Sequence, residues 1–98
     1  MKLGIGREKT ILFVCVENAG RSQMAEGFFN ARYAPKGYRA ISAGTRPSSQ
    51  INPLAVQAMK EAGIDIGKQR SKIITEQMIQ GSARAVNMGC LALAVAQP

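Results

Sequence analysis

Residues 10–33, TILFVCVENAGRSQMAEGFFNARY, decide the fold. The segment opens with a run of β-branched and apolar residues, 10–16, that does not alternate with polar ones. Such a run is typical of a strand buried on both faces of a parallel sheet. From Ser22 the pattern becomes helical, because apolar residues recur four positions apart until Pro35. The segment therefore predicts a strand, a short turn and a helix, with Cys15 at the end of the strand.

The rest of the chain continues this succession of strands and helices. Residues 38–43 alternate like a second strand, and residues 44–50, rich in Ser, Gly and Pro, predict a loop. Asn52 is expected to cap a helix that ends at Gly63. The apolar stripe expected on this helix consists of Leu54, Ala55, Ala58, Met59 and Ala62. The remaining predicted elements are a short helix over residues 75–80 and a third strand over residues 84–88.

This order of elements predicts an α/β fold, namely a small three-layer domain with a mostly parallel sheet and right-handed crossovers. At 98 residues, 46% of them apolar, the chain is long enough for one core and too short for two. Residues 1–98 are therefore expected to form a single domain. In sheets of this kind ligands bind beyond the carboxyl ends of the strands, and Cys15 is predicted to lie at such an end.

Composition limits the classes of partner and the compartment. Lys and Arg outnumber Asp and Glu by 13 to 6, but the basic residues are scattered and aromatic residues make up only 5% of the chain. We therefore expect no nucleic-acid partner, and the positive charge favours an anionic substrate. The first ten residues lack the apolar core of a secretory signal, and the apolar run 91–96 is too short to span a bilayer. These features predict a cytoplasmic protein with no membrane partner, whose two cysteines are reduced or catalytic.

The strongest chemical signal is the spacing of Cys15, Arg21 and Ser22, which fits Cys-x5-Arg-Ser. A loop of this length can wrap backbone N–H groups around one tetrahedral anion, with the positive end of the next helix directed at it. The Arg21 guanidinium can grip two oxygens at once, and the same donors stabilise a thiolate at Cys15. Asn18 and Gly20 suit left-handed backbone positions. The predicted oxyanion-binding loop consists of Val16, Glu17, Asn18, Ala19, Gly20 and Arg21.

A plainer interpretation is that Cys15 is a small buried hydrophobe, as free cysteines often are. The context favours the anion-binding interpretation, because a buried strand precedes the motif, a helix follows it, and residues suited to a tight turn lie between them. We therefore expect Cys15 to be a nucleophile that attacks a bound oxyanion.

Four stretches of the chain carry a resemblance to a known family. They are FVCVENAGRSQMAEGFF (13–29), ISAGT (41–45), NPLAVQAMKEAGIDIGKQRSK (52–72) and VNMGC (86–90). Together they resemble the low-molecular-weight protein tyrosine phosphatase superfamily, in particular its thiol-dependent arsenate reductase branch. The resemblance implies a phosphatase I-like fold.

The same resemblance implies roles for individual residues. Cys15 would be the nucleophile, Arg21 the oxyanion clamp and Ser22 the hydrogen-bond partner of the thiolate, while Asn18 would hold the shape of the loop. Cys90 would attack the Cys15 adduct of arsenate, which releases arsenite and leaves a disulfide for a thioredoxin-like protein or another thiol to reduce. No cofactor is required, but some family members bind potassium near the loop. The matching potassium ligands here would be Asn18, Glu26, Ser42 and Asp65.

Each of the less specific residues also has an ordinary interpretation. Cys90 fits a buried structural thiol at the end of a strand. Glu26 fits a solvent-facing helix residue, and Asp65 fits a polar turn residue.

The chain also departs from the family pattern. Family members continue through a third cysteine and an Asp-Pro loop whose aspartate protonates the leaving group, whereas Asp65 is the only aspartate here. The C-terminal strand and helix of the fold are therefore expected to be missing, and an uncovered sheet edge would suit a monomer or a weak dimer. Three functions stay open: an arsenate reductase, a protein tyrosine phosphatase, and a non-catalytic oxyanion-binding remnant.

Overall fold

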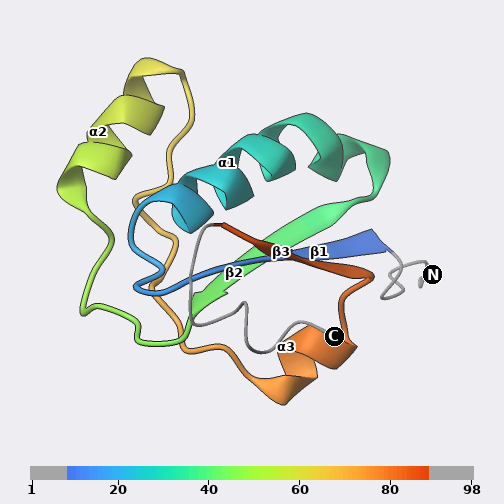
Figure 1. Cartoon of the computed structure of the whole chain (residues 1–98). Helices are drawn as coiled ribbons and strands as arrows, with labels where there is room; N and C mark the ends of the chain where they lie inside the picture. Colours follow the sequence, from blue (N-terminus) through green and yellow to red (C-terminus); the bar gives the residue numbers. More distant parts are fainter. Residues whose placement is uncertain (1–8, 89–98) are drawn as a thin grey trace.

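The centre of the structure is strand β1 (Thr10–Cys15), which lies between β2 (Arg39–Gly44) and β3 (Arg84–Asn87) in a parallel sheet of order β2-β1-β3. The computed structural model describes residues 9–88. In the register of the sheet, Cys15 pairs with Gly44 on β2, and Val14 pairs with Asn87 on β3. All three strands therefore point their carboxyl ends at the same edge, where Cys15 lies (Figure 1).

Helices cover both faces of the sheet, so the α/β fold with a parallel sheet is confirmed (Figure 1). On one face, the buried side chains of Leu12 and Val14 pack with Met78 of α3 (Glu76–Gln80). On the other face, Phe13 meets Phe29 of α1 (Arg21–Tyr33) edge to face, with ring centroids 6.2 Å apart. The unbroken apolar run of β1 is thus explained, since its side chains enter a core on each side.

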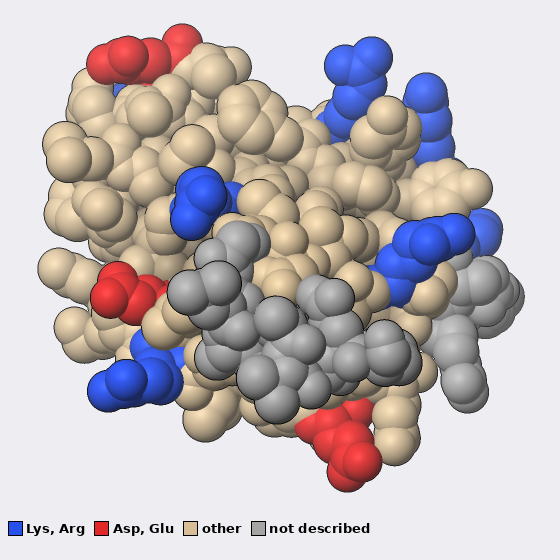
Figure 2. Space-filling model, viewed as in Figure 1, with Lys and Arg blue, Asp and Glu red and all other residues tan. Residues whose placement is uncertain are grey.

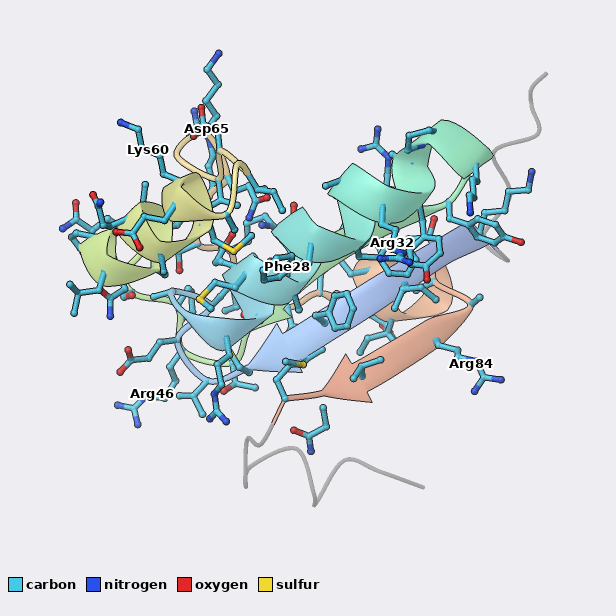
Figure 3. The ribbon with its side chains drawn as sticks, turned by 90° about the horizontal axis from the view of Figure 1, so that it is seen from above. Phe28, Arg32, Arg46, Lys60, Asp65 and Arg84 are labelled. Carbon is cyan, nitrogen blue, oxygen red and sulfur yellow. The ribbon has the colours of Figure 1, made fainter. Side chains whose placement is uncertain are left out.

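Helix α1 starts one residue earlier than predicted and ends at Tyr33 as expected, followed by a short 3-10 turn, η2 (Ala34–Lys36). Its buried side differs from a plain apolar stripe. The fully buried residues of the helix are Ser22, Gln23 and Gly27, whereas Phe28 is 49% exposed (Figure 3). The inward face of α1 therefore combines small and polar residues with the apolar side chains of Met24 and Phe29.

Helix α2 (Pro53–Glu61) begins as predicted, because the Asn52 side chain accepts a hydrogen bond from the Leu54 N–H at 2.8 Å. Its predicted apolar stripe was too wide. Ala55 and Met59 are buried, but Leu54 is 77% exposed, since α2 packs along only a narrow line against α1. Gly27 permits this close packing, because a Cβ there would lie 3.0 Å from Met59 Cε of α2 and 2.6 Å from Cγ2 of Ile66, which follows α2.

The remaining elements lie within a residue or two of their predicted bounds. Thr75 caps α3 by accepting a hydrogen bond from the Met78 N–H at 3.1 Å. No helix within residues 9–88 is long and apolar enough to cross a membrane. On the face shown in Figure 2, the Lys and Arg side chains are scattered and do not form one patch.

Candidate active site

The loop between β1 and α1 is held from outside by the loop that follows β2. The carbonyl oxygens of Cys15, Val16, Glu17 and Ala19 accept hydrogen bonds from the backbone N–H groups of Thr45, Arg46, Ser48 and Asn52, at 2.8–3.1 Å. Because these carbonyls are engaged by the second loop, the N–H groups of the first loop are the polar groups available to an anion. The two loops must approach closely for this. A Cβ on Gly44 would lie only 2.4 Å from the Val16 carbonyl oxygen, so glycine is needed there.

Within the loop, Asn18 has the left-handed conformation expected for it, with φ of 51°. The expectation for Gly20 was wrong, because its φ is −126° and it serves as the N-cap of α1. Asn18 is thus the one residue between β1 and α1 that has a left-handed backbone. Its backbone N–H donates a hydrogen bond to the Cys15 sulfur at 3.1 Å.

The sulfur of Cys15 has a second partner in the Ser22 hydroxyl, 2.9 Å away. Ser22 Oγ also accepts a hydrogen bond from Asn18 Nδ2 at 2.9 Å. A hydroxyl can donate one hydrogen bond while it accepts another, so Ser22 can donate to the sulfur while it accepts from Asn18. Ser22 and Asn18 are both fully buried, so these contacts are shielded from water.

A cavity of about 420 Å³ opens over the sulfur. Its lining residues are Cys15, Val16, Glu17, Ala19, Gly20, Arg21 and Met88. The structure therefore gathers most of the predicted oxyanion-binding loop around one hollow, while Asn18 lies buried beneath it. Met88 follows β3, and its N–H donates to the Val14 carbonyl at 2.8 Å. The predicted resolving residue, Cys90, lies outside the described residues.

Behind the loop, three of the four predicted potassium ligands lie together. Asn18 Nδ2 donates to Ser42 Oγ at 2.9 Å, and Ser42 Oγ donates to Glu26 Oε1 at 2.5 Å. Asp65 does not join them, because it lies exposed after α2, and its carboxylate accepts the Gly67 N–H at 2.8 Å (Figure 3). Among residues 9–88, no group of three or more His, Cys, Asp or Glu side chains could hold a metal ion.

Lys72, and not Asp65, is the fourth residue beside Asn18, Glu26 and Ser42. Its ammonium nitrogen is 3.9 Å from Glu26 Oε1 and donates to the Arg70 carbonyl at 2.6 Å. Burial lowers the pKa of Lys72, and the negative charge of Glu26 partly opposes this shift. The backbone N–H of Lys72 also donates to Asn18 Oδ1 at 2.8 Å.

Two glutamines complete the support of the loop, and neither they nor Lys72 was predicted. Gln23 is fully buried and donates to Asn18 Oδ1 at 3.0 Å and to the Arg70 carbonyl at 2.7 Å. Gln69 in turn donates to Gln23 Oε1 at 2.7 Å. One sequence signal was present, because Gln23 is four residues from Gly27, and a helix places both on the same face.

Comparison with known proteins gives a consistent result. Residues 10–87 match the family described as low molecular weight phosphotyrosine protein phosphatase. An arsenate reductase from Staphylococcus aureus is 41% identical over 81 residues, which is 83% of this chain and 60% of that protein. The chain thus spans about 60% of the length of the curated relatives that it matches.

Two solved structures extend the comparison. The low molecular weight protein tyrosine phosphatase from T. tengcongensis superposes with a TM-score of 0.80 at 35% identity, covering 92% of this chain and 66% of that one. The thioredoxin-dependent arsenate reductase of Corynebacterium glutamicum gives a TM-score of 0.78 at 37% identity, covering 85% of this chain and 41% of that one.

Proposed function

Because the chain belongs to the low-molecular-weight phosphotyrosine protein phosphatase family, we propose that Cys15 attacks a bound tetrahedral oxyanion and that arsenate is the substrate. The observation that carries this proposal is the environment of the Cys15 sulfur. The sulfur accepts a hydrogen bond from the Asn18 N–H and contacts the Ser22 hydroxyl. It also faces a cavity that Arg21 lines. These groups orient the sulfur toward the space that a bound oxyanion would fill, as attack by a cysteine nucleophile requires.

The proposed reaction begins when the Cys15 thiolate attacks the As(V) centre of arsenate and a protonated oxygen leaves as water. Arg21 and the loop N–H groups would balance the charge of the oxyanion during this step. A second thiol then attacks the Cys15 sulfur, and the S–As bond breaks with its electron pair on arsenic. Arsenic is thereby reduced from As(V) to As(III) and leaves as arsenite, while the two thiols are oxidised to a disulfide.

We propose Cys90 as the second thiol and a thioredoxin-like protein or small thiol as the final reductant. Two observations support Cys90. It is the only other cysteine of the sequence, and it comes two residues after Met88, which lines the same cavity as Cys15. A thioredoxin-dependent enzyme is also among the structurally similar proteins.

Phosphatase activity is the second candidate, favoured by the similarity to the T. tengcongensis phosphatase. Ester cleavage is helped by an acid that protonates the leaving alkoxide, typically by ~10²- to 10⁴-fold in rate. Among the described residues that line the cavity, the only carboxyl group belongs to Glu17. Asp65 is engaged with Gly67 after α2. Arsenate reduction by thiol attack needs no acid for an alkoxide, and we favour it because the arsenate reductase from Staphylococcus aureus is 41% identical over the matched residues.

The test of this proposal compares two assays on one preparation. Purified chain is incubated with arsenate, thioredoxin, thioredoxin reductase and NADPH, and arsenite is measured; a parallel sample receives p-nitrophenyl phosphate. We expect arsenite formation that exceeds phosphate ester hydrolysis and is lost in Cys15→Ser. The opposite order of activities would support the phosphatase. If neither product forms while phosphate still binds, the chain is a non-catalytic oxyanion-binding protein.

A further inference from the structure

We infer that the ammonium group of Lys72 is the resident cation of the polar cluster behind the cysteine loop, and that this chain therefore does not use potassium there. The polar cluster is defined as Asn18, Ser22, Glu26, Ser42 and Lys72. The inference deepens the proposed function, since it makes Lys72 a positioning residue for the Cys15 thiolate.

The cluster contains a negative charge that needs a counter-charge. The side chain of Glu26 is only 14% exposed, and among residues 9–88 Lys72 is the one cation found in an ion pair with it. An ionised carboxylate is rarely buried to this extent without a paired cation. The ammonium of Lys72, 3.9 Å from Glu26 Oε1, meets this need without a bound metal.

The oxygen atoms of the cluster do not fit a potassium ion as they are arranged. Potassium is bound in proteins by several oxygens that replace its water shell. Here Asn18 Oδ1 already accepts two hydrogen bonds, from Gln23 Nε2 and from the Lys72 N–H. The Asn18 amide presents hydrogens to Ser22 and Ser42, and a cation is repelled by those hydrogens.

The orientation of the Asn18 amide follows from a donor that cannot be reversed. The Lys72 backbone N–H can only donate, so the atom that it meets must be Asn18 Oδ1, and Nδ2 must face the two serines. A chain of contacts then runs from the Lys72 ammonium through Glu26, Ser42, Asn18 and Ser22 to the Cys15 sulfur.

This chain of contacts explains how a lysine remote from the cavity acts on the nucleophile. Glu26 accepts the Ser42 hydrogen, so Ser42 must accept from Asn18, which fixes the amide in place. Asn18 also donates to Ser22, which leaves the Ser22 hydrogen for the sulfur. The Lys72 ammonium lies 3.9 Å from Glu26 Oε1 and holds this carboxylate beside Ser42, and so keeps every donor in this series directed toward Cys15.

The test replaces the ammonium and leaves the backbone contacts of Lys72 unchanged. Lys72→Met keeps the N–H that binds Asn18 and the carbonyl that accepts the Gly44 N–H at 2.7 Å. Lys68→Met is the matched control, because Lys68 is exposed and carries the same charge. Each protein is studied in ~100 mM potassium chloride and in choline chloride at equal ionic strength, so that general screening is the same in both salts.

Two readouts are measured, and neither needs turnover: the thermal midpoint, and the alkylation rate of Cys15 well below that midpoint. We expect wild type and Lys68→Met to give the same values in both salts. Lys72→Met should lose up to about 4–8 °C in midpoint in choline, the upper end of the shift for one partly exposed charge pair in a domain of this size. Its Cys15 alkylation should slow, and potassium should restore part of both losses.

The double variant Lys72→Met, Glu26→Gln removes both charges and should show no response to potassium. The inference is overturned if wild type responds to potassium over choline, if Lys72→Met matches Lys68→Met, or if Lys72→Met gains no potassium response. It is also overturned if the double variant keeps such a response, because the ion would then bind elsewhere. A failure of arsenate reduction leaves all of these measurements in place, so it is distinguishable from a failure of this inference.

Discussion

Replacement of Asn18 by alanine should destabilise the protein more than any other single change in the loop. The left-handed backbone at this position, with φ of 51°, costs alanine roughly 1–2 kcal/mol. The variant also leaves the part-buried N–H of Lys72 without its acceptor, at roughly 1–3 kcal/mol, and removes donors to Ser22 and Ser42. We expect a total loss of about 3–5 kcal/mol in the free energy of unfolding, a large part of the stability of a small domain.

Urea denaturation measures this loss, and two further variants separate its causes. Asn18→Gly removes the same hydrogen bonds but accepts the left-handed backbone, so it should retain about 1 kcal/mol more stability than Asn18→Ala. Asn18→Asp keeps an acceptor for the Lys72 N–H and loses the donors to the serines, so it should fall between wild type and Asn18→Gly. The reasoning is refuted if Asn18→Ala unfolds within ~0.5 kcal/mol of wild type, the range of an ordinary surface change.

Three further predictions concern the loop and its chemistry. Arg21→Lys should weaken phosphate binding measured by calorimetry at least tenfold (~1.4 kcal/mol), because a point charge cannot copy a two-point planar grip; unchanged affinity would show that Arg21 is not the clamp. Gly44→Ala should cost about 1–3 kcal/mol in urea unfolding, since its Cβ would lie 2.4 Å from the Val16 carbonyl oxygen; an unchanged midpoint would contradict the close approach of the two loops. Cys90→Ser should abolish arsenite formation and keep phosphate binding, and peptide mapping of oxidised wild type should find a Cys15–Cys90 disulfide. If Cys90 stays reduced while arsenite accumulates, an external thiol resolves the adduct.

The parts of the fold that sequence predicted well depend on local signals. The apolar run of β1, the Asn52 and Thr75 caps, and Pro53 at the start of α2 each fix an element through residues within a few positions. The Cys15 to Ser22 spacing likewise places a nucleophile, a turn and a helix start in one short segment.

The errors arise where burial depends on distant parts of the chain. Leu54 fits an apolar stripe on its own helix, but no other segment within residues 9–88 covers that side of α2, so it is 77% exposed. Gln23 and Lys72 look like surface residues by type. Their partners lie far away in sequence, since the Gln23 side chain meets the carbonyl of Arg70 and the Lys72 ammonium meets Glu26. Only the folded arrangement supplies the hydrogen bonds that make burial of these polar groups acceptable.

Contacts between distant parts of the chain also explain why the prediction for Asp65 was wrong. The resemblance to the family implied Asp65 as a potassium ligand together with Asn18, Glu26 and Ser42. The backbone instead brings residue 72 against Asn18, and residue 72 carries a positive charge. A lysine brings a positive charge to the site, whereas an aspartate would bring a negative charge that binds a cation. The spacing of residues along the sequence does not reveal which of the two reaches the site.

The central claim is that Cys15 is a reactive thiolate in an oxyanion-binding loop, and differential alkylation tests it most directly. The chain has only two cysteines, so mass spectrometry of peptides after timed treatment with iodoacetamide reports both rates in one sample. We predict that Cys15 alkylates faster than an ordinary thiol near neutral pH. Phosphate or arsenate at ten times its dissociation constant should slow this reaction about tenfold, because only the free loop reacts. A Cys15 that reacts at the rate of an ordinary thiol, with no effect of saturating oxyanion, would contradict the account.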